Sequence, residues 1–282
     1  MKNILVPTDF SEEAKNALEV AVEIVKLSLG KITLLHVVDI PAPASPVNLV
    51  GDYITTIPDN LYLEQITENA KARVREIVTN PAFEGINLSE RIVLGNIYSS
   101  IELETEENQI DLIVMGSKGT SGLGEFLIGS NTEKVVRRVK CPVLTIKRKA
   151  SVFAIKDIVF ATNLADDQGL VLNQVKMFQK LFGSIIHILK VNTPDSFEET
   201  KSINKRMHDF VQRYQLENYT LNTYNSKVTE DGIINFAEEI NANLIAMGTH
   251  GRSGIAHLIS GSIAEDVVNH ATRMVLTIKM NK

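Results

Sequence analysis

The sequence predicts an α/β fold in two similar domains, each with a five-stranded parallel sheet and helices on both of its faces. Short apolar segments such as Ile32–Val38 alternate with longer segments whose apolar residues recur at helical spacing, which is typical of βα units. The same order of segments occurs twice along 282 residues, a length sufficient for two domains of ordinary size. A glycine-rich segment follows the fourth predicted strand in each copy.

The first domain is expected to span residues 1–149. It opens with the strand Ile4–Val6, and a helix then runs to the stop signal Gly30. A Pro-rich segment between residues 39 and 60 predicts a mobile flap beside the ligand site. The further elements expected are strands at 32–38, 91–94, 111–114 and 143–146, and helices at 61–78, 98–107 and 131–139.

The second domain is expected to span residues 150–282, after a basic linker at Lys147–Lys149. It differs in length mainly after its second strand, where the connection is short and leaves the ligand site less covered. The elements expected are strands at 158–160, 185–191, 220–224, 243–246 and 274–279, and helices at 168–182, 197–214 and 231–240.

The glycine-rich segments predict phosphate sites. The first has the spacing Gly116-x2-Gly119-x9-Gly129-Ser130, and the second repeats it as Gly248-x2-Gly251-x9-Gly261-Ser262. Glycines allow the backbone to approach a ligand closely, and the first N–H groups of the following helix point at an anion. One such motif is a weak signal, but its recurrence in both halves is far less probable by chance.

This spacing after a DLIVMG strand resembles the nucleotide-binding class of universal stress proteins in a tandem arrangement. The openings at Asn3–Ser11 and Asp157–Ala165 and the closings at Cys141–Lys147 and Met274–Lys279 are similar to that family too, so the resemblance covers nearly the whole chain. It implies two flavodoxin-like (adenine nucleotide alpha hydrolase-like) domains that bind ATP or a related adenine nucleotide. It also implies a stress-response protein that acts as a sensor or switch rather than a fast enzyme.

The binding residues are expected where the first strand and the strand before the glycines end, because open α/β sheets bind ligands at that edge. The phosphates should meet Met115, Gly116, Lys118, Gly119, Gly129, Ser130 and Asn131. The resemblance implies Asp9 at the nucleoside and backbone groups of Val38 at adenine, beside the turn at Pro7 and Thr8. The second copy offers Asn163, Met247, Gly248, His250, Gly251, Arg252, Gly261 and Ser262, and it departs from the family pattern where Ala161 and Asn163 replace Pro7 and Asp9.

Structural roles remain open for several of these residues. Ser130-x-x-Glu133, Ser262-x-x-Glu265 and Asp9-x-x-Glu12 are each typical of a helix start, so these residues could serve only as caps. His36 and His187 are interpreted as core histidines at matching places of the second strands. His250 and His257 have no Asp, Glu or Cys cluster with them, so no protein-ligated metal is expected, while Mg²⁺ held through phosphates stays open.

No catalytic residue is predicted, because the sequence has no Gly-x4-Gly-Lys-Ser/Thr, Gly-x-Ser-x-Gly or Cys/His pair. We therefore expect a protein that is not an enzyme. Two alternatives remain: a scaffold that binds protein partners or an apolar small molecule, and a slow ATPase that depends on an unknown protein partner.

Composition bears on the binding partners and the cellular location of the protein. A net charge of −5 disfavours nucleic-acid binding, and no apolar run reaches the roughly 18 residues of a membrane span. A single cysteine, Cys141, favours a reducing compartment, and its place before an apolar strand predicts a buried structural thiol. The expected location is the cytoplasm.

The last strand of each domain, Val143–Ile146 or Val275–Ile278, would be an exposed sheet edge if it stayed unpaired. We expect the two strands to pair antiparallel, so that the domains form an internal pseudo-dimer, with a further homodimer left open. The two sites are expected to be unequal, and the first to be the stronger, because a charged Asp9 is a better acceptor than Asn163.

Overall fold

The computed structural model describes residues 1–39, 60–119, 128–249 and 260–280. The predicted flap therefore lies outside the described residues. In the first half the elements are β1 Asn3–Pro7, α1 Glu12–Ser28, β2 Lys31–Val38, α2 Asn60–Val78, β3 Leu88–Leu94, α3 Ile97–Glu107, β4 Leu112–Gly116, α4 Ser130–Arg138 and β5 Val143–Ile146. In the second half they are β6 Asp157–Ala161, α5 Gly169–Phe182, β7 Ile185–Asn192, α6 Thr200–Arg213, β8 Tyr219–Asn225, α7 Thr229–Glu239, β9 Leu244–Thr249, α8 Ser260–His270 and β10 Met274–Lys279.

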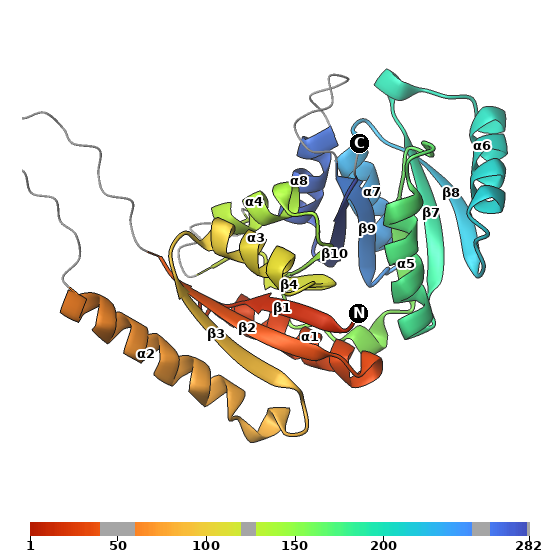
Figure 1. Ribbon diagram of the computed structural model, residues 1–282. Coiled ribbons are helices and arrows are strands. Elements are labelled where there is room, and N and C mark those ends of the chain that lie inside the picture. Colours follow the sequence, from red (N-terminus) through yellow and green to blue (C-terminus); the bar gives the residue numbers. More distant parts are fainter. Residues whose placement is uncertain (40–59, 120–127, 250–259, 281–282) are drawn as a thin grey trace, which may run out of the picture.

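The described strands form one sheet in the order β3-β2-β1-β4-β5-β10-β9-β6-β7-β8 (Figure 1). Within each half all pairings are parallel, so each half has the predicted five-stranded parallel sheet. The order changes direction between β1 and β4 in the first half and between β6 and β9 in the second. A ligand site is expected at each of these two positions.

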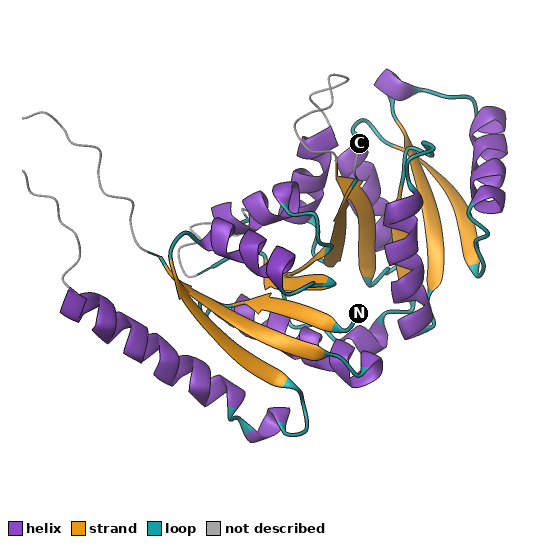
Figure 2. Cartoon of the chain, viewed as in Figure 1, coloured by secondary structure: helices purple, strands orange, loops and turns teal. Residues whose placement is uncertain are grey.

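Helices cover both faces of the sheet (Figure 2). Residues of α1, α2, α5 and α6 share one apolar core with the sheet, and residues of α3, α4, α7 and α8 share the other. Side chains alternate between these cores along each strand, so Ile4 and Val6 face α1 while Leu5, between them, faces the opposite core. Strands buried on both faces explain why the sequence shows continuous apolar runs.

Strands β5 and β10 pair antiparallel, which confirms the pairing expected from the sequence. Leu144 lies opposite Leu276 in the ladder. Two threonines add reciprocal side-chain bonds: Thr145 Oγ1 donates to the Val275 carbonyl at 3.2 Å, and Thr277 Oγ1 donates to the Val143 carbonyl at 3.4 Å. The pairing joins two five-stranded sheets into a single one.

Cys141 is a buried structural thiol, as predicted. Its Sγ donates to the Ile110 carbonyl at 3.3 Å, and burial raises the pKa of this thiol to about 12. The thiol therefore stays protonated at neutral pH. Among the described helices, none is long and apolar enough to cross a membrane.

Residues 1–149 and 150–282, expressed separately, are expected to associate or to aggregate, because each half would expose β5 or β10 as an open edge. Size-exclusion chromatography with light scattering, on each half and on their mixture, measures this. Halves that remain monomeric both alone and when mixed would contradict the expectation.

Candidate functional site

The turn after β1 places Asp9 at the edge of the sheet. The Thr8 N–H donates to the Leu35 carbonyl at 2.8 Å, and Phe10 adopts a left-handed conformation with φ 67°. Asp9 Oδ1 accepts the Ser11 N–H at 3.0 Å. Ser11, and not Asp9, is the N-cap of α1, so the interpretation of Asp9 as the start of a capping box is wrong.

Two glycines of the motif are required by close packing. A Cβ at Gly116 would lie 2.8 Å from Glu13 Cβ and 2.9 Å from the Glu13 backbone carbon, so only glycine lets β4 pass under α1. A Cβ at Gly119 would overlap Asp9 Oδ2. The Asp9 carboxylate is therefore held against the backbone of the glycine segment.

Gly129 has no such packing requirement. Its φ is −65°, which any residue can adopt, and an added Cβ would make only ordinary contacts, the nearest at 3.6 Å from the Gly119 nitrogen. Gly129 lines the cavity described below. The space that a side chain would fill at Gly129 therefore stays open on the cavity side.

The N-terminus of α4 has no side-chain cap. Gly129 is the N-cap residue, and Ser130, for which a capping role had stayed open, is the exposed first helical residue. The buried Thr132 side chain donates to the Gly116 carbonyl at 3.0 Å, away from the helix N–H groups. N–H groups of an uncapped first turn attract an anion.

These features surround a cavity of about 180 Å³ in the first half. Of the predicted residues, only Val38 is missing from its lining, and the neighbouring Val37 takes that place. The Val38 carbonyl already accepts the Gly95 N–H at 3.0 Å. The lining comprises Pro7, Thr8, Asp9, Ala14, Leu35, Val37, Ile97, Ile101, Met115, Gly116, Lys118, Gly119, Gly129, Ser130, Asn131 and Thr132.

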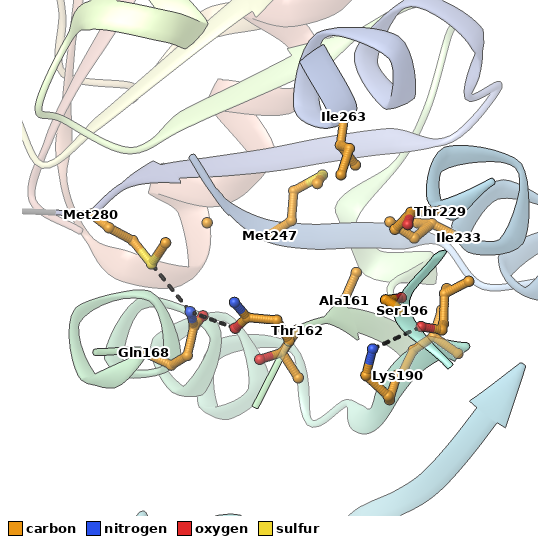
Figure 3. A pocket seen from close by; sticks show the side chains of 14 residues that line it. Ala161, Thr162, Gln168, Lys190, Ser196, Thr229, Ile233, Met247, Ile263 and Met280 are labelled. Carbon is orange, nitrogen blue, oxygen red and sulfur yellow. Dashed lines mark hydrogen bonds between the residues drawn. The ribbon is translucent and has the colours of Figure 1, made fainter. Parts of the chain in front are cut away.

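A cavity of about 240 Å³ lies at the corresponding place of the second half (Figure 3). Asn163 repeats the turn of Asp9, since its Oδ1 accepts the Ala165 N–H at 3.1 Å, and Leu164 repeats the left-handed φ at 61°. The lining comprises Ala161, Thr162, Asn163, Gln168, Leu189, Lys190, Val191, Ser196, Thr229, Ile233, Met247, Gly248, Ile263 and Met280.

Three residues that the sequence analysis missed distinguish this second cavity. Met280 Sδ would be 2.9 Å from a Cβ at Gly248 and receives a bond from Gln168 Nε2 at 3.2 Å, so these side chains reach into the cavity (Figure 3). Lys190 Nζ donates to the Val191 carbonyl at 3.0 Å, and burial lowers the pKa of Lys190. The position of Lys190 follows only from the strand register, which aligns it with His36 and which sequence composition does not specify.

Part of the predicted second site lies outside the described residues, namely His250, Gly251 and Arg252. Gly261 and Ser262 are the second and third residues of α8, so Ser262 is not the N-cap that the sequence allowed. The last two residues of the second glycine motif thus lie inside the first turn of α8. In the first half the helix starts only after Gly129.

The prediction that His36 and His187 occupy matching places is wrong. The registers of β1 with β2 and of β6 with β7 align His36 with Lys190 and His187 with Thr33. Both histidines are half-buried and hydrogen-bonded: His36 Nδ1 to the Thr8 carbonyl, His187 to Asp157 and Thr220, each at 2.8 Å. In the described part of the chain, no group of three His, Cys, Asp or Glu side chains could hold a metal.

A family model described as the universal stress protein family matches residues 1–147 and again residues 154–279. The chain belongs to the universal stress protein family. It is 33% identical over 162 residues to a universal stress protein of Methanocaldococcus jannaschii, covering 53% of this chain and 97% of the relative. It is 23% identical to a universal stress protein of Synechocystis over 295 residues, covering 99% of this chain and 100% of the relative.

The fold of this universal stress protein is shared with a solved relative over its full length. The crystal structure of a universal stress protein from Archaeoglobus fulgidus matches with a TM-score of 0.76 at 22% identity, covering 99% of this chain and 98% of that one. The two-domain arrangement is thus found in a structure of this family.

Replacing Gly116 and Gly129 by alanine should separate a glycine required by packing from one that packing does not require. Gly116→Ala is expected to lower the free energy of unfolding by about 1–3 kcal/mol, because its Cβ meets α1 backbone. Gly129→Ala should lower it by less, by about 0.5–1 kcal/mol, because alanine is less favourable than glycine at an N-cap but meets no close contact there. Urea denaturation measures both, and equal destabilisation would contradict the distinction.

Proposed function

We propose that the first-half cavity binds ATP or a related adenine nucleotide, and that the protein acts as a sensor or switch in stress responses. The main observation in support of this proposal is the N-terminus of α4, which has no side-chain cap and lies at a cavity lined by Gly116, Gly119 and Gly129. Gly129 in particular lacks a side chain where packing within the protein does not demand it. The first-turn N–H groups would bind the phosphates, with the Lys118 ammonium beside them.

The nucleoside would lie toward β1. Asp9 can accept bonds from ribose hydroxyls or the adenine amine, and charge-assisted bonds are stronger than neutral ones. The apolar side chains of Leu35, Val37 and Met115 line the same cavity and would contact the base. Mg²⁺, in this proposal, is carried by the nucleotide phosphates.

Fast turnover is not part of the proposal. Phosphoryl transfer needs a positioned nucleophile and charge neutralisation, and Lys118 is the only cation among the described residues that line the first cavity. Asp9, the one carboxylate among those described lining residues, already accepts the Ser11 N–H. We expect nucleotide binding without measurable steady-state hydrolysis by the purified protein.

A scaffold that binds an apolar small molecule is the second candidate, and the second cavity favours it. Met247, Met280, Ile233 and Ile263 line that cavity, and methionine adapts its shape to apolar ligands. The joined sheet supports a related proposal, that the two domains act as an internal pseudo-dimer. Mass analysis of small molecules retained through native purification separates an adenine nucleotide from a lipid or an empty protein.

Gly129→Ala is expected to weaken ATP binding at least tenfold while leaving the fold intact, because its methyl group takes the space of a phosphate oxygen. Isothermal titration calorimetry measures the affinity, and urea denaturation supplies the control for folding. Unchanged affinity in a folded Gly129→Ala protein would contradict the proposed site. Hydrolysis at an ordinary enzymatic rate, about 1–100 s⁻¹, would contradict the role of a switch.

The two sites are expected to differ in affinity about fivefold, the first being tighter, since Asn163 offers a neutral acceptor where Asp9 is charged. The Arg206 Nη2 bond to the Asn163 carbonyl, 2.8 Å, also restricts the second turn. Calorimetric titration of ATP into Gly129→Ala, which keeps the second site, and into Gly261→Ala, which keeps the first, compares the two affinities. Tighter binding by Gly129→Ala than by Gly261→Ala would show the opposite order.

A further inference from the structure

A third cavity, of about 420 Å³, lies where the linker between the halves meets the start of β10. Four cationic residues line it: Lys147, Arg148 and Lys149 from the linker side and Arg273 just before β10. Asn243, before β9, lies beside them, and no Asp or Glu is among the lining residues in the described part of the chain. We call this set of residues the linker corner.

The cations of the linker corner lack a full set of partners. Arg273 Nε is buried and has no hydrogen-bond partner among the described residues. Lys147 Nζ donates to the Asn269 carbonyl, yet burial, Lys118 and Arg148 lower the pKa of Lys147 to about 8. Placing like charges together without a counter-ion costs free energy, and an anion bound between them would offset that cost.

The nearby carboxylates do not supply this counter-ion. Glu23 of α1 accepts the Ser151 hydroxyl at 2.8 Å and the Val152 N–H at 2.7 Å, so it holds the linker in place. Glu19 reaches only the exposed Lys149, at 4.0 Å. Lys147, Arg148 and Arg273 have no ion pair with a carboxylate in the described part of the chain.

The other half of the protein provides an internal comparison. The strand registers place Asp111 at the position of Asn243, and Cys141 at that of Arg273. Continuing along β5 and β10 places Met280 at the position of Arg148. Each of these three differences makes the linker corner more positive by one charge than its counterpart. Thr272, at the position of Lys140, makes it less positive by one, so the net difference over these four positions is two positive charges.

Asn243 shows that this difference is one of charge and not of structure. Asn243 Oδ1 accepts the N–H groups of Lys156 and Asp157 at 3.0 and 3.3 Å. Asp111 Oδ2 accepts the equivalent N–H groups of Lys2 and Asn3, at 2.6 and 3.0 Å. A carboxylate would therefore serve the same structural purpose at residue 243, and the linker corner has an amide instead.

We propose that the linker corner is an anion-binding site for a compact polyanion of the phosphate class, with Arg273 and Arg148 as its principal donors. Guanidinium groups bind phosphate oxygens through paired, charge-assisted hydrogen bonds. The site is separate from the proposed nucleotide cavity, because the two share no lining residue. The phosphate group can come from a free inorganic anion or from a larger phosphorylated molecule.

The probe is inorganic pyrophosphate, titrated calorimetrically into the full-length protein. Asn243→Asp should weaken binding at least tenfold, because it introduces a carboxylate among the cations while keeping both N–H bonds. Arg273→Gln should weaken binding to a similar extent. Arg75→Gln, an exposed position on α2, changes the net charge equally and should leave binding unchanged, which controls for nonspecific attraction.

Gly129→Ala distinguishes this site from the nucleotide cavity, and it should leave pyrophosphate binding unchanged even if it abolishes ATP binding. If Gly129→Ala lost pyrophosphate binding while Asn243→Asp kept it, the anion would be assigned to the nucleotide cavity and the proposal would be overturned. No binding to the wild-type protein, or equal weakening by Arg75→Gln, would overturn it as well. A competing phosphorylated molecule that displaces pyrophosphate would identify the larger source of the phosphate group.

Discussion

The antiparallel pairing of β5 with β10 is the constraint on which the arrangement of the whole protein depends. Each half alone would end in an open edge strand, β5 or β10, and the pairing covers both of these edges at once. Because the pairing is antiparallel, the carboxyl end of one parallel sheet lies beside the amino end of the other. The cavities at β1/β4 and β6/β9 therefore lie at opposite edges of the joined sheet.

The two halves share the backbone of their sites but differ in the side chains that line them. The turn after the first strand keeps its side-chain bond and its left-handed residue in both halves, at Asp9 and Phe10 and again at Asn163 and Leu164. The side chains that line the cavities differ: Lys190 lines the second cavity, whereas His36, at the same register position, is not among the described residues lining the first. Since the shared fold fixes where a ligand can bind and the side chains fix which ligand, the halves need not have the same function.

Most helices and strands could be predicted to within three residues, because runs buried on both faces and helical periodicity are strong local signals. In the first half the predicted site residues line one cavity, apart from Val38, which the family resemblance had suggested. Helix starts were less predictable, because Ser11 and Asp9 are both residue types that cap helices well. Only the contact between Asp9 and Gly119 shows why the Asp9 side chain points to the glycine segment and leaves the cap of α1 to Ser11. The misplaced alignment of His36 with His187 has a different cause, since apolar strands of similar composition give no sequence signal for register.

The linker corner could not be predicted for the same reason, because Arg148, Asn243 and Arg273 come together only through the β5–β10 pairing. The parallel pairing of β4 with β5, in which Gly116 lies beside Ile146, brings the linker corner near the first glycine segment. Lys118 lines the first cavity, and its charge is one cause of the lowered pKa of Lys147 in the linker corner. An anion that neutralises Lys118 would therefore favour protonation of Lys147, and by linkage a protonated Lys147 would favour that anion. The two positions interact through charge although they share no residue, so the junction between the halves is an electrostatic connection as well as a structural one.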